Sequence, residues 1–286
     1  MVVGRQRTSG VCVRAPPISI NICATIVLMY RPGHDWPILI AANRDEMNTR
    51  SWRAPGRHWH DRKDVTAGLD ELGGGTWLGI NDAGVVAGVL NRLNSLGPMS
   101  GCRSRGELPL EALDHAEART AAEALGQLDP LAYRPFNLVI ADRTEAFWLR
   151  SAATSGDEGV TALKGQDHPR VDVLSLPPGL SMITAYDLND MNSPRIRNFR
   201  PKLLAAPLPD PSSGDWSGWI DILAETKGEE GAGPGGAMTI KTATGFGTVS
   251  SSLIALPAQS EGPKRYPIWL FADGRPGEVP FQPVAS

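Results

Sequence analysis

The chain has 286 residues, of which 41% are hydrophobic and 21% are charged, and its formal net charge at pH 7 is −3. This composition is typical of a soluble globular protein, and it excludes a largely disordered chain and a strongly basic nucleic-acid-binding protein. No apolar run approaches the roughly 20 residues of a transmembrane helix, and three cysteines without paired spacing predict neither a disulfide framework nor a zinc site, so we expect a reducing, cytoplasmic location.

Residues 1–22 differ from the rest of the chain, because they contain three arginines and no acidic residue. They lack the continuous apolar core of a secretory signal. A disordered tail, a removable leader and a start codon assigned too far upstream all fit this composition. We favour the last, since a regular pattern begins abruptly at Cys23. We therefore expect an N-terminal extension over 1–22 and a single domain over 23–286.

The chain after this extension opens with a predicted pair of strands. Two apolar runs, at residues 23–29 and 37–42, flank a turn-forming segment at 31–35. In an antiparallel pair, the start of the first strand lies beside the end of the second. The thiol that begins the first run is therefore expected next to the polar residues that follow the second. The resulting candidate active site consists of Cys23, Asn43, Arg44, Asp45 and Glu46.

Residues 47–72 are polar and predict a loop. His58 and His60 lie two residues apart in it, so they share one face if the segment is extended, and they form a candidate metal pair. A metal site needs at least a third ligand, which the sequence does not indicate. A solvated loop is therefore the preferred interpretation.

The glycine-rich segment at 73–84 lacks the Gly-Lys-Ser/Thr ending of a phosphate loop. It predicts instead a close backbone approach and a turn, which join strands at 76–80 and 85–90. Asn91 ends the second strand. Its amide is a candidate donor to a developing oxyanion, with the capping of a turn as the alternative.

The middle of the chain predicts helices. Two capping-box patterns, Ser104 with Glu107 and Thr120 with Glu123, each precede an apolar stripe and predict one or two helices before residue 129. The remainder predicts mainly strands, at 136–141, 146–150, 171–176, 180–184, 246–256 and 267–272, and a helix at 216–227.

A polar segment, residues 186–195, leads into a further helix that Pro194 is expected to start and that runs through Phe199. Asn189 and Arg195 are candidate substrate contacts on this segment, and a solvated helix entrance is the alternative. Together, about eight to ten strands that are mostly joined as hairpins, with helices grouped in sequence, predict an α+β fold of packed layers.

The order of several motifs resembles that of the NRDE family, which is named for the tetrapeptide that stands here at residues 43–46. The supporting matches are the strand that opens at Cys23, the run Gly74–Ile80, the strand that reaches Asn91, and the runs Phe136–Leu138 and Phe246–Thr248. The resemblance covers most of residues 23–272. It implies a four-layer αββα sandwich similar to N-terminal nucleophile hydrolases, whose cysteine members begin at the catalytic thiol.

The resemblance also implies roles for the candidate residues. Cys23, once it is the first residue, would be the nucleophile, with its own α-amine as base and no cofactor. Arg44 would lower the pKa of the thiol or hold a substrate anion, Asp45 would orient the amine, and Asn91 would help to bind the oxyanion. The candidate substrate-binding residues are Asn43, Glu46, Trp77, Asn189 and Arg195.

Three positions depart from the family pattern. Ile22 rather than Met precedes Cys23, and Val249 and Ala185 stand where related cysteine hydrolases place an arginine and an asparagine. These departures leave the chemistry open. The first hypothesis is a hydrolase that cleaves the amide bond of a small molecule through a thioester at Cys23.

The alternative is a non-catalytic protein that binds and transports haem or acyl-CoA and lipids, because members of the family have been linked to these ligands. Cys23, His34 and His58 are candidate haem ligands, although the chain has no Cys-x-x-Cys-His motif. A stable scaffold that only binds partner proteins is a third interpretation.

Overall fold

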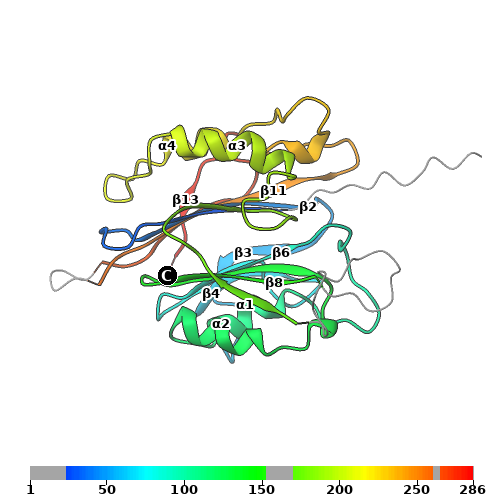
Figure 1. The fold of residues 1–286 in the computed structure, drawn as a ribbon, viewed down its shortest axis with the longest axis vertical. Helices are drawn as coiled ribbons and strands as arrows, with labels where there is room; N and C mark the ends of the chain where they lie inside the picture. Colours follow the sequence, from blue (N-terminus) through cyan, green and yellow to red (C-terminus); the bar gives the residue numbers. More distant parts are fainter. Residues whose placement is uncertain (1–23, 153–169, 260–264, 286) are drawn as a thin grey trace, which may run out of the picture.

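The computed structural model describes residues 24–152, 170–259 and 265–285, so Cys12 and Cys23 lie outside the described residues. Two antiparallel sheets stack face to face, and helices cover the outer face of each sheet (Figure 1). The layers follow the order helix, sheet, sheet, helix. This confirms the predicted α+β class and the four-layer αββα sandwich.

The first sheet has six strands in the order β10-β1-β2-β11-β12-β13, and helices α3 and α4 cover its outer face (Figure 1). Its strands are β1 Thr25–Tyr30, β2 Ile38–Met47, β10 Gly179–Ile183, β11 Phe246–Leu256, β12 Ile268–Ala272 and β13 Gln282–Pro283, and its helices are α3 Pro194–Ala205 and α4 Ser217–Leu223.

The second sheet has seven strands in sequence order, β3 to β9, and helices α1 and α2 lie against its outer face (Figure 1). Its strands are β3 Trp52–Gly56, β4 Val65–Asp70, β5 Leu78–Asn81, β6 Val86–Asn91, β7 Phe136–Ala141, β8 Ala146–Ser151 and β9 Asp172–Ser175. The helices are α1 Glu107–Leu113 and α2 Ala118–Gly126, and 3₁₀ turns occupy Pro130–Ala132 and Pro234–Gly236.

The alternation of side chains along β2 explains how one strand serves two cores. Ile38, Ile40 and Ala42 point into the core between the two sheets. Leu39 and Ala41 point the other way and pack under α3 and α4. Because successive side chains of a strand lie on opposite faces, an apolar run without interruption is needed to bury both faces.

Buried asparagines attach loops to the sheets at three places. In each case the side-chain amide donates to two backbone carbonyls: Asn43 to Leu223 and Met238, Asn81 to Leu113 and His115, and Asn137 to Thr184 and Tyr186. An amide with both protons bonded is stable in a dry core, whereas an unpaired one is costly. These contacts fix the loops that follow the helices and β10.

The first predicted strand pair is confirmed, but the prediction that the second strand ends before Asn43 is wrong. β2 continues through the charged tetrapeptide to Met47, because β11 pairs with it over the whole of that length. The prediction of a loop over 47–72 is also wrong, since β3 and β4 lie within it.

The helix starts differ from the predicted capping boxes. Ser104 Oγ accepts a hydrogen bond from the Gly106 backbone, and α1 begins only after Gly106. Thr120 lies inside α2, because Asp142 in the β7–β8 turn caps the first amide of that helix, at Ala118. This cap comes from a residue far along the chain, so local patterns do not reveal it. Predicted strands at 136–141 and 246–256 are confirmed with their bounds unchanged.

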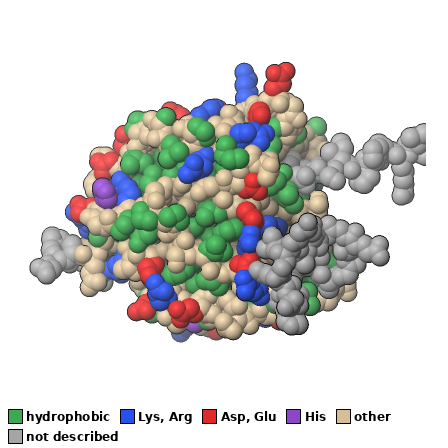
Figure 2. Space-filling model, viewed as in Figure 1, with side chains coloured by type: hydrophobic (Ala, Val, Ile, Leu, Met, Phe, Trp, Pro, Cys, Tyr) green, Lys and Arg blue, Asp and Glu red, His purple; other side chains and the backbone are tan. Residues whose placement is uncertain are grey.

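The surface seen in Figure 2 intersperses acidic and basic side chains with apolar ones. Many of the charged groups are paired, for example Arg57 with Asp82 and Lys202 with Glu225. Within the described ranges, no helix combines the length and the apolar character that crossing a bilayer requires.

We predict that Asp142→Ala lowers the free energy of unfolding by roughly 2–3 kcal/mol, since the carboxylate accepts bonds from Ala118, Thr144 and Glu145. Burial alone would raise the pKa of Asp142, but these hydrogen bonds outweigh it and hold the pKa below its usual value. The stabilisation is therefore present above pH ~4 and is lost as pH falls through the lowered native pKa.

Urea unfolding of the parent and of Asp142→Ala between pH 2 and pH 7 measures this difference. Asp82→Ala is the matched control, because that carboxylate pairs with Arg57 at the exposed surface. Its removal is expected to lower the free energy of unfolding by less than about 1 kcal/mol. Equal losses of stability in the two variants at pH 7 would contradict the assignment.

Candidate active site

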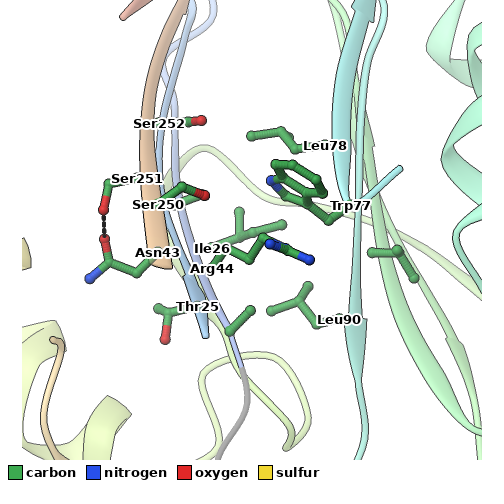
Figure 3. A pocket seen from close by; sticks show the side chains of 13 residues that line it. Thr25, Ile26, Asn43, Arg44, Trp77, Leu78, Leu90, Ser250, Ser251 and Ser252 are labelled. Carbon is green, nitrogen blue, oxygen red and sulfur yellow. Dashed lines mark hydrogen bonds between the residues drawn. The ribbon is translucent and has the colours of Figure 1, made fainter. Parts of the chain in front are cut away.

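A recess lies between the two sheets, where β1, β2 and β11 face β5 and β6 (Figure 3). The volume of the recess accessible to water is about 20 Å³, and the recess is partly open to solvent. The residues that matter for its chemistry are Ala24, Arg44, Trp77, Leu90, Ser250 and Ser252. Figure 3 shows the Arg44 side chain extending from β2 into the space between the sheets, toward Trp77.

Arg44 is a buried cation that has no counter-ion within the part of the chain that the structure describes. Only 7% of the residue is exposed, and among the described residues its guanidinium forms no ion pair and its Nη1 has no hydrogen-bond partner. Burial lowers the pKa of Arg44 to about 10, so the group stays charged at neutral pH. The guanidinium carbon lies 4.1 Å from the centre of the Trp77 ring and 5.5 Å from that of Trp52. These rings stabilise the cation and leave its donors available to a ligand.

The position of Trp77 depends on Gly68 in the neighbouring strand β4. A Cβ atom at Gly68 would lie 2.2 Å from the Cη2 atom of the indole, so only glycine leaves room for the ring. Trp52 packs edge-on against Trp77 with ring centres 5.6 Å apart, and against Phe271 at 6.0 Å. The recess therefore has a rigid aromatic wall on the side that contacts the guanidinium.

Asp45 points away from Arg44, toward the helical layer. Its Oδ2 accepts a bond from Arg195 Nη1 of α3 at 3.1 Å, and its Oδ1 accepts one from Thr248 Oγ1 at 2.6 Å. Arg195 Nη1 also donates to Thr25 Oγ1 at 2.5 Å. Burial raises the pKa of Asp45, while the charge of Arg195 and the two hydrogen bonds act in the opposite direction. This buried cluster connects β1, β2, β11 and α3.

A β-bulge in β11 makes this arrangement possible. Asp45 pairs in register with Thr248 and Arg44 with Ser250, so Val249 is an extra residue between the two pairs. In a regular strand, residues two apart, such as Thr248 and Ser250, share one face. The bulge changes this, so Thr248 contacts Asp45 on the helical side and Ser250 lies beside Arg44 on the recess side (Figure 3).

The remaining residues of the tetrapeptide have other surroundings. The Asn43 side chain points away from the recess (Figure 3), and its oxygen accepts a bond from Ser251 while its amide donates to two backbone carbonyls. Both amide protons and one acceptor position of Asn43 are thus bonded within the protein, and its substrate contact stays a prediction. Glu46 is half-buried, and its Oε2 lies 3.6 Å from Arg50 Nε.

Two other predicted residues are placed away from Arg44. Asn91 pairs in register with Phe136, a core residue beneath α1 and α2, whereas its neighbour Leu90 lines the recess. Alternation therefore directs Asn91 toward the helices. Asn189 has a left-handed backbone with φ of 54°, and its Oδ1 accepts bonds from the backbone of Met182 and from Arg200. The oxyanion role of Asn91 and the substrate contact of Asn189 therefore stay predictions.

Two residues that the sequence analysis did not single out, Ser250 and Trp52, lie beside Arg44 in the structure. The alternating hydroxyls of residues 246–256 were a visible signal, but the bulge decides which of them face the recess. In the candidate metal pair, His58 contacts the backbone: its Nε2 lies 2.9 Å from the carbonyl oxygen of Ala54. Within residues 24–152, 170–259 and 265–285, no three His, Cys, Asp or Glu residues gather as a metal site.

We predict that Gly68→Ala forces the Trp77 ring from its place and lowers the free energy of unfolding by roughly 1–3 kcal/mol, because the new methyl group overlaps the ring. Near-ultraviolet circular dichroism reports the ring movement, and thermal unfolding reports the stability. Gly56→Ala is the control, since its Cβ would meet only the His58 ring at 3.3 Å. An unchanged spectrum in Gly68→Ala would contradict the close packing of the Trp77 ring against Gly68.

We predict that Asp45→Asn and Arg195→Met each destabilise the protein by roughly 3–5 kcal/mol, because each leaves a buried charge without its partner. The double variant is expected to lose clearly less than the sum of the two single losses. Chemical denaturation of the four proteins gives the coupling energy. Lys202→Met with Glu225→Gln, an exposed pair, provides the reference. Simple additivity at Asp45 and Arg195 would contradict a coupled buried pair.

Comparisons with known proteins agree with this architecture. The model of the family described as "Transport and Golgi organisation 2" matches residues 23–182. The Transport and Golgi organization protein 2 homolog of Bos taurus is 39% identical over 116 residues, which are 37% of this chain and 38% of that protein. The Homo sapiens homolog is 34% identical over 117 residues, 38% of this chain and 40% of that protein. The chain thus spans about two fifths of the length of these curated relatives.

Among solved structures, the Caenorhabditis elegans N-acylethanolamine-hydrolyzing acid amidase ortholog is similar over 83% of this chain and 94% of its own, with a TM-score of 0.50 and 12% sequence identity. At this identity the likeness concerns the fold, which is that of N-terminal nucleophile hydrolases. With a family model that matches more than half of its residues, the chain belongs to the Transport and Golgi organisation 2 family, the NRDE family, and has an N-terminal nucleophile hydrolase-like fold.

Proposed function

We propose that the protein hydrolyses the amide bond of a small molecule that carries an anionic group, with Cys23 as the nucleophile. Arg44 carries this proposal, because it is a buried guanidinium without an ion-pair partner among the described residues, in a recess that Ala24 also lines. Ala24 is bonded to Cys23, and consecutive Cα atoms are about 3.8 Å apart. We therefore assign Cys23, the residue before Ala24 in the chain, as the nucleophile that serves this recess.

The proposed reaction has two steps. The α-amine of Cys23 takes the proton of the thiol, and the thiolate sulfur attacks the carbonyl carbon of the amide. The C–N bond breaks, the proton passes to the departing amine, and a thioester remains. Water then attacks the thioester, which releases a carboxylic acid and restores the thiol. The α-amine can act as base only when no residue precedes Cys23.

The residues around the recess have distinct roles in this proposal. Arg44 holds the anionic group of the substrate and, as a nearby cation, lowers the pKa of the thiol. Trp77 fixes the guanidinium plane. Asp45 and Arg195 act as positioning residues, since they hold Thr25 and with it the start of β1, two residues after the nucleophile.

The fold supports the choice of an amide bond. The structural neighbour from Caenorhabditis elegans is by its title an amidase that hydrolyses N-acylethanolamines. A shared fold does not transfer a substrate, so the choice of an anionic amide rests on the unpaired Arg44 rather than on this neighbour.

We predict that Cys23→Ser lowers amide hydrolysis by at least roughly 100-fold, because an alcohol replaces the thiolate. The assay follows release of amine from N-acyl amino acids and from the same compounds with the carboxylate converted to a neutral amide. Intact mass and N-terminal sequencing identify the active species. Cys102→Ser, at a half-buried thiol in a loop, is the matched control.

Full activity in Cys23→Ser would overturn the proposal, and so would full activity of a chain that retains residues before Cys23. A preference for the neutral substrates would leave the nucleophile in place but remove the role given to Arg44.

A further inference from the structure

We propose that Ser250 and Arg44 together form a carboxylate-binding subsite, and that Ser250 determines the specificity for that group. This inference deepens the proposed function, since it names the anion that the amide substrate carries. It depends on two buried polar groups that face the same recess and have no partner among the described residues, Arg44 Nη1 and Ser250 Oγ.

Ser250 differs from the neighbouring hydroxyl residues of β11. Thr248 donates to Asp45, and Ser251 donates to Asn43. Ser250 is only 1% exposed, and its hydroxyl has no such partner within the described residues. A buried hydroxyl without a hydrogen bond destabilises a protein, so its presence beside an unpaired cation indicates that a ligand completes both groups.

Arg44 and Ser250 are placed to contact one ligand together. They are cross-strand partners in the β2–β11 ladder, and residues paired in this way on one face have Cβ atoms about 4.5–5.5 Å apart. Figure 3 shows both side chains directed into the space between the sheets. A carboxylate has two acceptor oxygens, so one can accept from the guanidinium and the other from the hydroxyl.

The charges near Arg44 favour an anion with a single charge. Arg50 and Asp70 form a part-buried pair with a distance of 2.6 Å, so they largely cancel each other. Glu46 adds a negative charge that acts on Arg44. Among the described residues, these four side chains together carry no net charge, so no second cation is left to hold a dianionic phosphate, and a singly charged carboxylate fits the guanidinium better.

The wall of the recess indicates what the carboxylate is attached to. Trp77 covers one side of the guanidinium, and Leu90 and Leu78 lie on the same side of the recess. A compact apolar or aromatic group joined to the carboxylate would pack against these side chains. The inferred ligand class is thus a carboxylic acid with a short apolar substituent, carried by the amide substrate.

The test measures binding of phenylacetate by isothermal titration calorimetry and by quenching of tryptophan fluorescence, in a Cys23→Ala background without turnover. Phenylacetamide, which has the same shape and no charge, and inorganic phosphate are the comparison probes. We expect phenylacetate to bind more tightly than either. Ser250→Ala is expected to weaken it by roughly tenfold or more, and Arg44→Met to abolish measurable binding.

Ser151→Ala is the matched control. Ser151 is also a fully buried serine whose hydroxyl has no partner among the described residues, but it lies in β8 and does not line the recess. Both alanine variants remove an unsatisfied group, so both are expected to fold with unchanged or slightly higher thermal stability. Only Ser250→Ala is expected to weaken the binding of phenylacetate.

Equal binding of phenylacetate by Ser250→Ala and by its parent would overturn the role of Ser250. Tighter binding of phosphate than of phenylacetate would overturn the assignment of the ligand's anionic group as a carboxylate. Binding in the Cys23→Ala background does not depend on the hydrolytic reaction. Loss of hydrolysis in the thiol variant together with normal phenylacetate binding supports both proposals. Binding that persists in a protein with no amidase activity overturns only the proposed function.

Discussion

The two-residue alternation along β2 is the constraint on which the rest of the structure depends. It places Arg44 in the space between the sheets and Asp45 under the helices, although the two residues are adjacent in the chain. If both side chains shared a face, they would neutralise each other. Separated by the strand, the carboxylate pairs with Arg195 to hold the layers together, and the guanidinium keeps its charge for a ligand.

An unpaired buried cation is costly, and the aromatic wall explains how this fold tolerates one. The ring of Trp77 lies against the guanidinium and offsets part of the lost hydration, and Trp52 and Phe271 extend the same wall. Gly68, which lies in the same sheet as Trp77 and across from Arg44, provides the space for that ring. The recess is therefore a product of both sheets, and its chemistry depends on how closely they stack.

The sequence predicts much of this fold and only part of the site. Three strands could be identified from local patterns, because alternation and length are local properties. These are the strands in the apolar runs that end at Met29 and Ala42 and in the hydroxyl-rich run at 246–256. The cap that Asp142 gives to α2 is a contact between distant segments and leaves no local pattern. Likewise the tetrapeptide reveals polar residues at the right place, but the division of its side chains between two faces requires knowing that β2 continues to Met47.

The bulge at Val249 shows how β11 holds one residue more than β2 without moving either hydroxyl. Deletion of Val249 would restore regular pairing and keep Thr248 opposite Asp45 and Ser250 opposite Arg44, because consecutive residues of a strand lie on opposite faces. If the present sequence instead paired without a bulge, one end of β11 would shift by one residue and change faces. The buried ion-pair cluster or the recess would then lose its hydroxyl partner. In this part of the chain, the position at which the ladder takes up the extra residue matters as much as the identity of the residues.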